Sequence, residues 1–220
     1  MPGFINPCGG KRWQILSNGL IEVENEGTPA VAEGTTAFTQ MAQTWANFGG
    51  LFQAAAAKYG VPVTWVLAVA TMETGYLSSD PAKQAAAQSP VGAIGVMQVM
   101  PFNATAFGLS DASELYDPAK NIDVGTHILA NDMKNADAGG LPGVSALYNS
   151  GKLCTTDPTR NEWMLLADSN YPRHVIEWNN AAIMAGLTGF GQGMLAVMGA
   201  VTGAAVAVAV VGRRVKAAKR

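Results

Sequence analysis

The spacing of apolar residues differs on the two sides of residue 35. Before it, two short apolar stretches, residues 13–16 and 20–24, flank the dipeptide Asn18-Gly19. Asn-Gly between two such stretches is the strongest short-range signal of a β-hairpin with a type I′ turn. We therefore expect a small β-hairpin arm within residues 1–34.

From Thr36 the apolar residues recur at helical spacing. One stripe of an amphipathic helix contains Phe38, Met41, Ala42, Trp45 and Phe48. Gly49-Gly50 is expected to end this helix. The same spacing resumes over residues 51–59, which predicts a second helix that stops at Gly60.

Residues 63–72 carry no charge and almost no polar side chain, which predicts a central helix buried on every side. Asp117 followed by Pro118 is typical of a helix start. Further helices are expected near residues 144–149 and 162–167, and from Tyr171. Apart from the arm, the chain is predicted to be all-α.

The C-terminal part is strongly apolar. Between Glu177 and Arg213 there is no charged residue, and Thr202 is the only polar side chain of residues 194–212. As a helix that segment would be about 28 Å long at ~1.5 Å per residue, close to the ~30 Å of a bilayer's hydrocarbon. We expect three parts: the arm (1–34), a helical domain (35–180), and a hydrophobic helix with a basic tail (181–220). The last helix either enters a membrane through residues 181–212 or packs against protein.

Charge and rare residues narrow the possible functions. All 16 acidic residues lie within 1–177, with nine of the 14 basic ones, which argues against nucleic acid contact by the folded domain. Cys8 and Cys154 permit one disulfide and leave the redox compartment open. His127 and His174 have no ligand partners at zinc-site spacing, so no metal is expected. The sequence also has no P-loop and no nucleotide-binding glycine-rich turn, so no other cofactor is expected.

Glu73 is the strongest candidate for chemistry. It directly follows the uncharged residues 69–72 at the carboxyl end of the predicted central helix, where apolar surroundings and the helix dipole both raise a carboxyl pKa. A carboxyl that stays protonated near neutral pH can act as a general acid on a glycosidic oxygen. On position alone, the alternative is an exposed carboxylate paired with Lys or Arg.

Four motifs, in order and spacing, resemble the soluble lytic transglycosylase family of the lysozyme superfamily. They are Met72-Glu-Thr-Gly-Tyr76, Gly92-Ala-Ile-Gly-Val-Met-Gln-Val-Met-Pro101, Asn121-Ile122 with Gly125, and Ala146-Leu-Tyr-Asn-Ser-Gly151. The resemblance extends from about Leu51 to Val175 and implies a lysozyme-like helical domain. It also implies a peptidoglycan-cleaving activity.

The resemblance implies roles for six residues. Glu73 corresponds to the catalytic acid/base, and Tyr148 lies beside it as a second catalytic residue. Residues expected to bind substrate are Thr74, Met97, Gln98 and Asn149. Thr74 stands where the family usually has Ser, and it keeps the hydroxyl.

The expected reaction needs one carboxyl. Glu73 would protonate the bond between N-acetylmuramic acid and N-acetylglucosamine and then activate the muramoyl C6 hydroxyl, which gives a 1,6-anhydro sugar. Most glycosidases use two carboxylates, and a muramidase that hydrolyses the same bond is the alternative. Candidates for the second carboxylate are Asp80, Asp111 and Glu114, all of which also fit solvated loop charges.

The sequence at the two ends of the chain predicts the compartment in which the protein acts. The start has no signal-peptide pattern, and the basic residues from Arg213 favour a cytoplasmic tail with residues 1–177 on the outer side. We expect delivery by a bacteriophage particle, with the protein first in the virion and then at the host periplasm or cytoplasmic membrane. Expected partners are peptidoglycan glycan strands, the bacterial membrane and other virion proteins. The alternative is a virion structural or membrane-conduit protein that uses the lysozyme-like domain as a scaffold.

Overall fold

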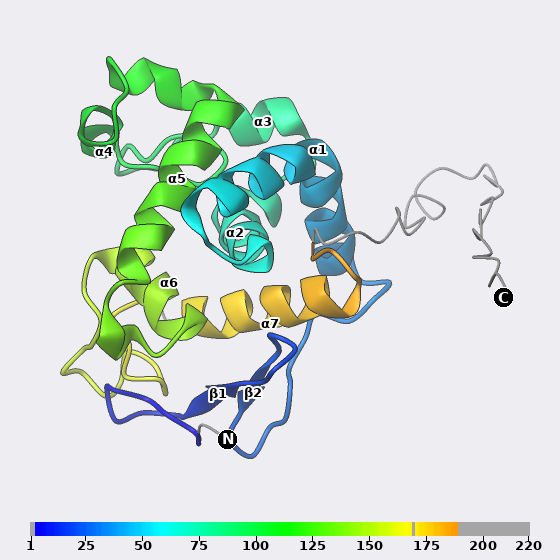
Figure 1. The fold of residues 1–220 in the computed structure, drawn as a ribbon, viewed down its shortest axis with the longest axis vertical. Helices are drawn as coiled ribbons and strands as arrows, with labels where there is room; N and C mark the ends of the chain where they lie inside the picture. Colours follow the sequence, from blue (N-terminus) through cyan, green and yellow to red (C-terminus); the bar gives the residue numbers. More distant parts are fainter. Residues whose placement is uncertain (1–2, 169, 189–220) are drawn as a thin grey trace, which may run out of the picture. The chain divides into compact units, whose positions relative to one another are not determined.

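The computed structural model describes residues 3–168 and 170–188. Within them the protein is all-α with one β-hairpin, as predicted (Figure 1). The helices are α1 (Thr36–Tyr59), α2 (Val63–Ala70), α3 (Pro81–Ala86), α4 (Pro101–Ala106), α5 (Pro118–Asp132), α6 (Leu141–Ser150) and α7 (Tyr171–Met184). Shorter turns are the π-helical η1 (Thr71–Gly75) and the 3₁₀ turns η2 (Ala112–Tyr116) and η3 (Ala136–Ala138).

The predicted C-terminal hydrophobic helix, its membrane contact and the basic tail lie, from residue 189 on, outside the described residues. Among the described helices, none has the length and apolar character needed to cross a membrane. The helix that contains the predicted domain boundary at residue 180 continues to Met184.

Helix α2 is the centre of the core, as its sequence predicts. Figure 1 shows it in the middle of the domain with α1, α5, α6 and α7 around it, and it packs directly on α1 and α7. Every residue from Thr64 to Ala70 is buried. Because this helix is fixed on all sides, the turn that follows it, which contains Glu73, has a rigid base.

Helix α1 is one helix, so the expected break at Gly49-Gly50 is wrong. Phe48 and Phe52, on either side of the glycine pair, are both buried and pack edge to face with ring centroids 6.2 Å apart. Burial of two aromatic side chains outweighs the helix penalty of about 1 kcal/mol per glycine. The helix ends where predicted, at Gly60 with φ 71°.

The helix expected at residues 162–167 is absent from the described structure, and the segment runs as turns with one β-bridge between Cys154 and Leu165. The Asn161 side chain takes the place of helical hydrogen bonds by donating to the carbonyls of Leu165 (2.9 Å) and Ala167 (3.3 Å). Met164 has φ 56°, which a helix does not allow. A side chain that competes for backbone groups is the physical reason for the error.

The arm contains the predicted hairpin, β1 (Trp13–Ile15) and β2 (Ile21–Val23), paired antiparallel with Ile15 opposite Ile21. The expected type I′ turn is wrong. The Leu16 N–H bonds the Leu20 carbonyl (2.8 Å), which leaves a three-residue loop, and of that loop only Gly19 has a positive φ, at 86°. This is a three-residue hairpin loop with glycine in the left-handed position.

The arm is joined covalently to the helical domain by a disulfide between Cys8 and Cys154, whose Cα atoms are 5.4 Å apart. The sequence permitted this pairing without determining it.

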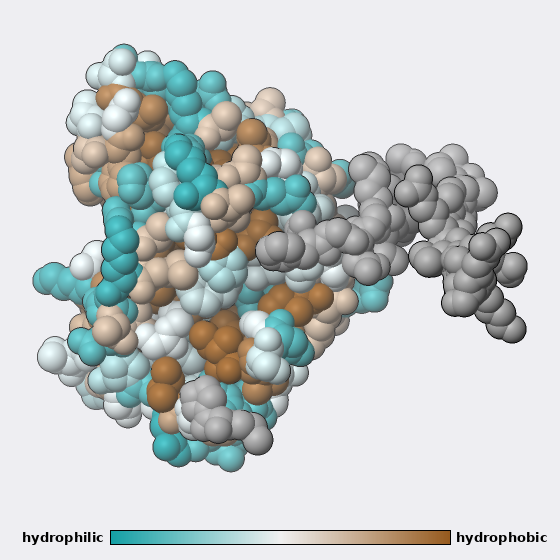
Figure 2. All heavy atoms as spheres, in the orientation of Figure 1, coloured by the Kyte–Doolittle hydropathy of each residue, from teal (hydrophilic) through white to brown (hydrophobic). Residues whose placement is uncertain are grey.

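Figure 2 shows one face of the molecule, on which hydrophobic residues form separate patches among hydrophilic ones.

Candidate active site

Glu73 lies in the π-helical turn η1, which directly extends the buried helix α2. The turn is closed by a hydrogen bond from the Tyr76 N–H to the Thr71 carbonyl (2.9 Å), five residues apart. Thr74, buried in the same turn, donates its hydroxyl to the Val96 carbonyl (2.7 Å). One extra residue in a helical turn is a feature often found at functional sites. Here it turns the chain away from the α-helical path at the candidate acid.

Glu73 is at a cleft with a volume of about 460 Å³. The lining side chains come from three parts of the chain: residues 72–77 in and after the η1 turn, residues 87–98, and the segment from α6 to α7. The polar ones are Glu73, Thr74, Gln88, Ser89, Gln98, Asn149, Asp168 and Tyr171. Tyr76 and Leu77, both exposed, give the rim an apolar part. Of the six residues predicted from the sequence, Glu73, Thr74, Gln98 and Asn149 therefore share one cleft.

The carboxyl of Glu73 has a strongly raised pKa, as expected. The pKa is raised to about 7: burial is the largest cause, the hydrogen bond from Tyr171 lowers the pKa in part, and the charge of Asp168 contributes to the rise. The Tyr171 hydroxyl donates to Glu73 Oε1 at 2.5 Å. Burial and the neighbouring Glu73 hold the pKa of Tyr171 well above its usual value, so this phenol remains a donor. At neutral pH Glu73 is thus present in both protonated and ionised forms.

Residues 92–98 are held in place by the buried side chain of Asn121 on α5. Its Oδ1 accepts from the Met97 N–H (2.8 Å), and its Nδ2 donates to the carbonyls of Ile94 (2.8 Å) and Leu115 (3.0 Å). Gly95 has φ 77°, and a Cβ there would lie 2.4 Å from Asn121 Nδ2. The glycine motif is therefore required for this close approach.

Gln98, at the end of this loop, adopts a left-handed backbone with φ 46°. Its Nε2 donates to the carbonyls of Gly95 (3.0 Å) and Ala87 (3.3 Å). The side chain is thereby fixed at the cleft wall, with Oε1 as its remaining acceptor. A non-glycine residue with positive φ costs free energy, and such strain is concentrated at functional sites.

Met97 and Tyr148 are placed behind the cleft. The Met97 side chain is fully buried, and a Cβ on Gly125 would lie 2.7 Å from its sulfur, so Met97 does not line the cleft. The Tyr148 hydroxyl donates to the Met97 carbonyl at 2.7 Å. Burial, with the charges of Glu73 and Asp132, raises the Tyr148 pKa well above its usual value. Tyr148 is near Glu73, but the direct hydrogen bond to Glu73 comes from Tyr171.

Asp168 and Tyr171 are the site residues that sequence reasoning missed. Tyr171 lies within the range of the family resemblance, which implies no role for it, and it reaches Glu73 across 98 residues of sequence. Asp168 directly follows residues 162–167, for which the sequence predicts a helix. Its side chain is 81% exposed, and its N–H bonds Asn149 Oδ1 at 3.3 Å. No local pattern marks either residue. Tyr171 is brought to Glu73 by packing of α7 against α2, and Asp168 by the path of the loop that precedes α7.

The three carboxylates considered as partners of Glu73 lie elsewhere in the described structure. Asp80 caps α3 by accepting from the N–H groups of Ala82 and Lys83, and Asp111 caps η2. Glu114 pairs with Lys120. None of the three lines the cleft, and the carboxylate that does so beside Glu73 is Asp168.

Both histidines contact other side chains of the helical domain. His127 stacks on Tyr59 with ring centroids 4.5 Å apart and meets Phe107 edge to face. His174 lies 3.3 Å from Glu177 on the same helix. Over residues 3–168 and 170–188, no group of three His, Cys, Asp or Glu side chains is placed to hold a metal ion.

Substitution of Tyr171 and of Asp168, the two neighbours of Glu73, is expected to shift the pH dependence of activity in opposite directions. Activity that needs protonated Glu73 falls as pH rises through its pKa of about 7. Tyr171→Phe removes an interaction that lowers this pKa, so the alkaline limb of the kcat profile is expected to move to higher pH. Asp168→Asn removes a charge that raises the pKa, so the limb is expected to move to lower pH. The measurement is kcat on purified peptidoglycan between pH 5 and about 9.

The control for this pair is Asp157→Asn, which removes an exposed carboxylate bonded to Thr159 and is expected to leave the profile in place. Shifts of Tyr171→Phe and Asp168→Asn in the same direction would contradict the assignment of Glu73 as the titrating acid.

Comparison with known proteins places this geometry in a family. The sequence matches the transglycosylase SLT domain over residues 50–165, more than half of its 220 residues. The matched range includes Glu73, Gln98, Asn121 and Asn149. It leaves out the arm, Asp168 and Tyr171.

Among solved structures, the chain is similar to an inactive mutant of the lytic transglycosylase Slt from Pseudomonas aeruginosa (22% identity, 62% of this chain, 24% of that chain, TM-score 0.46). It is also similar to the 70-kDa soluble lytic transglycosylase from Escherichia coli (22% identity, 69% and 28% of the two chains, TM-score 0.44). A third structure is a complex of the 70-kDa soluble lytic transglycosylase with bulgecin A (25% identity, 52% and 21%, TM-score 0.42). The chain spans about a quarter of the length of these proteins. On the family match over its central 116 residues, the chain belongs to the transglycosylase SLT domain family.

Proposed function

We propose that this protein is a peptidoglycan lytic transglycosylase that cleaves the β-1,4 bond between N-acetylmuramic acid and N-acetylglucosamine. The observation that carries the proposal is Glu73: a carboxyl at the wall of a 460 Å³ cleft, with a pKa of about 7 and one oxygen already bonded to Tyr171. A group with a pKa near the working pH can both give and take a proton in one cycle.

The reaction follows from these two states of Glu73. Because Oε1 accepts from Tyr171, the acidic proton is on Oε2, and it passes to the glycosidic oxygen as the bond to the muramoyl C1 breaks. The acetamido group of the substrate stabilises the positive charge at C1. The Glu73 carboxylate then takes the proton of the muramoyl C6 hydroxyl while O6 bonds to C1. The glycan is split without net addition of water, and Glu73 ends protonated.

The surrounding residues support this cycle. Tyr171 stabilises the ionised form between the two proton transfers. Asn149 and Gln98, which both line the cleft, offer amide atoms to the sugar. Tyr148 holds the Met97 carbonyl and with it the loop that ends in Gln98.

Product analysis separates this proposal from hydrolysis. Muropeptides released from purified peptidoglycan are expected to carry 1,6-anhydromuramoyl ends, which mass spectrometry distinguishes from reducing ends by the mass of one water. Reducing ends as the main product would instead support a muramidase. The exposed Asp168 beside Glu73 is the observation that favours this second candidate, since an inverting glycosidase needs a second carboxylate to activate water.

We further propose that the protein is a virion-associated enzyme of a bacteriophage that acts at the host periplasm or cytoplasmic membrane. Support for the membrane part comes from the uncharged residues 178–212 and the five basic residues after them. The Cys8–Cys154 disulfide suits an oxidising compartment. The alternative, a scaffold or conduit in the virion, is less well supported, because a scaffold has no use for a carboxyl tuned to about pH 7.

The membrane part of this proposal predicts co-sedimentation of the full chain with phosphatidylglycerol-containing vesicles. The chain truncated after residue 188, which keeps all of α7, is expected to stay in the supernatant and to cleave peptidoglycan at the same rate. Gln at the five basic positions of 213–220 should weaken binding in a salt-sensitive way, because each basic residue contributes about 1 kcal/mol at an anionic surface. Full-length protein left in the supernatant would favour the scaffold or conduit reading.

A further inference from the structure

One side of the candidate active site is built on parts of the chain that the N-terminal arm holds. Asn149 is at the end of α6, Asp168 is at the end of the 151–168 loop, and Tyr171 begins α7. Glu73 itself lies in η1, which extends α2 in the core. The acid and these three neighbours are therefore carried by different segments of the chain.

The 151–168 loop has little secondary structure of its own, and the arm is joined to it at several points. The disulfide connects Cys8 to Cys154 near the start of the loop. The Lys11 N–H donates to the Glu162 carbonyl at 2.8 Å. Asn6 Nδ2 donates to the Trp163 carbonyl at 2.9 Å. These bonds fix the backbone a few residues before Asp168.

Close packing between the arm and the loop adds to these bonds. A Cβ on Gly10 would lie 2.4 Å from the carbonyl carbon of Trp163, so the arm and loop backbones are in direct contact. The Trp163 ring is fully buried next to Trp13, with centroids 6.0 Å apart. The Trp13 indole N–H donates to the Gly139 carbonyl (2.8 Å), just before α6.

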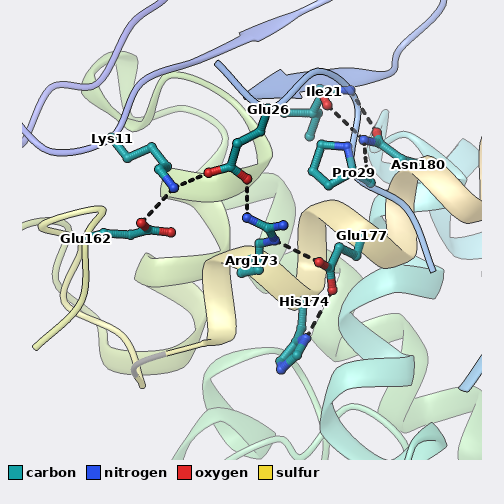
Figure 3. A network of polar contacts seen from close by, with 9 residues as sticks. All are labelled: Lys11, Ile21, Glu26, Pro29, Glu162, Arg173, His174, Glu177 and Asn180. Atoms are coloured by element: carbon teal, nitrogen blue, oxygen red, sulfur yellow. Dashed lines mark hydrogen bonds and ion pairs between the residues drawn. The ribbon is translucent and has the colours of Figure 1, made fainter. Parts of the chain in front are cut away.

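The arm also forms ion pairs and hydrogen bonds with α7. Figure 3 shows Glu26 between Lys11 and Arg173, and Arg173 in turn bonded to Glu177. Further along α7, the buried Asn180 Nδ2 donates to the carbonyls of Ile21 and Pro29, each at 2.8 Å. Thus the turn that leads into α6, the loop and α7 all have contacts to residues 5–29, and these three segments lead to or carry Asn149, Asp168 and Tyr171.

We propose that the arm positions active-site residues. Together with the Cys8–Cys154 disulfide, the arm holds Asn149, Asp168 and Tyr171 in their places relative to Glu73. The arm lies outside the residues that match the family. The proposal rests on the proposed function, because its main readout is glycan cleavage. It assigns positioning roles to Cys8, Cys154 and Asn6, none of which lines the cleft.

A positioning role of the arm can be distinguished by experiment from a role in stability alone, because only positioning changes the pH dependence of catalysis. The titratable groups that face Glu73 are Tyr148 on α6, Asp168 on the loop and Tyr171 on α7. If the loop loosens, the charge of Asp168 moves away from Glu73 while Tyr171 stays on its helix. The alkaline limb of the kcat profile is then displaced to lower pH, in the direction expected for Asp168→Asn.

The test compares the oxidised full chain with its Cys8→Ser/Cys154→Ser variant below the melting temperature of both. We expect kcat on purified peptidoglycan to fall about tenfold, the alkaline limb to move to lower pH, and amide hydrogen exchange to accelerate in residues 152–168 but not in α2. A thiol-free phosphine reductant should reproduce these changes in the wild type and have no effect on the variant, which is the matched control.

Asn6→Ala keeps the disulfide and removes one bond to the loop, and it is expected to shift the pH profile in the same direction by a smaller amount. It serves as the test if the double variant loses its fold. Unchanged kcat, pH profile and loop exchange in the reduced wild type would overturn the proposal. An oxidised wild type without activity would instead refute the proposed function, and loop exchange would still decide whether the arm holds the cleft.

Discussion

Replacing Glu73 by Gln is expected to lower the rate of peptidoglycan cleavage by about 10²–10⁴-fold, the usual contribution of a general acid. Gln has nearly the same volume and can still accept from the Tyr171 hydroxyl, so the cleft keeps its shape. Turnover of purified peptidoglycan at pH 6 measures the loss. Glu33→Gln, an exposed change in the arm, is the matched control and should be fully active.

The same variant is expected to change stability in a pH-dependent way. A carboxyl whose pKa rises on folding from 4.5 to about 7 stabilises the fold below pH 4.5, and that stability is lost as pH rises through 7. The wild type should therefore lose up to about 3 kcal/mol over this interval from Glu73, and the Gln variant should not. Urea unfolding at pH 5 and pH 8 tests this difference. A Gln variant that retains a tenth of wild-type activity would remove Glu73 from the role of acid.

Asn121→Ala is expected to be the most destabilising single change at the site. It leaves the Met97 N–H and the carbonyls of Ile94 and Leu115 without their partner in a fully buried place. At about 1–3 kcal/mol for each unsatisfied buried group, partly relieved by relaxation, we expect a loss of about 3–5 kcal/mol in the free energy of unfolding. Cleavage should fall as well, because Gln98 follows directly in the same loop.

Asn131→Ala is the matched control for this prediction. It lies on the same helix, is exposed, and contacts Lys134 through its side chain, so its cost is expected to be below about 0.5 kcal/mol. Urea denaturation of both variants gives the comparison. A loss below 1 kcal/mol for Asn121→Ala would mean that residues 92–98 are held by other contacts.

The features predicted well are those encoded locally. Asp117 and Pro118 start a helix because capping and the fixed proline φ act within one turn. Glu73 was recognisable because the apolar helix before it could only be buried. The Gly49-Gly50 break failed because the burial of Phe48 and Phe52 is decided by α2 and α5, which the local pattern does not contain.

The rest of the site depends on distant contacts. Asp168 ends a loop whose path is set by the Asn161 side chain and by the arm. Tyr171 is an ordinary first-turn residue of a helix until packing of α7 brings its hydroxyl to Glu73. The two cysteines allowed a bond but gave no sign of which surfaces it joins. Sequence patterns therefore located the acid and its loops, while its neighbours required the fold.

The contact between the arm and α7 sets an order of folding. Ile21 and Pro29 find their partner in Asn180, and Cys8 finds its partner in Cys154, so residues near the start of the chain stay unsatisfied until nearly all of the helical domain has been synthesised. In a chain that emerges N-terminus first from a ribosome, the local β1–β2 pairing can form early, but the arm can dock only after α7 has emerged. Docking of the hairpin thus follows synthesis of the helical domain, and the residues of the cleft that the arm supports are fully held only when the two ends of the domain have met.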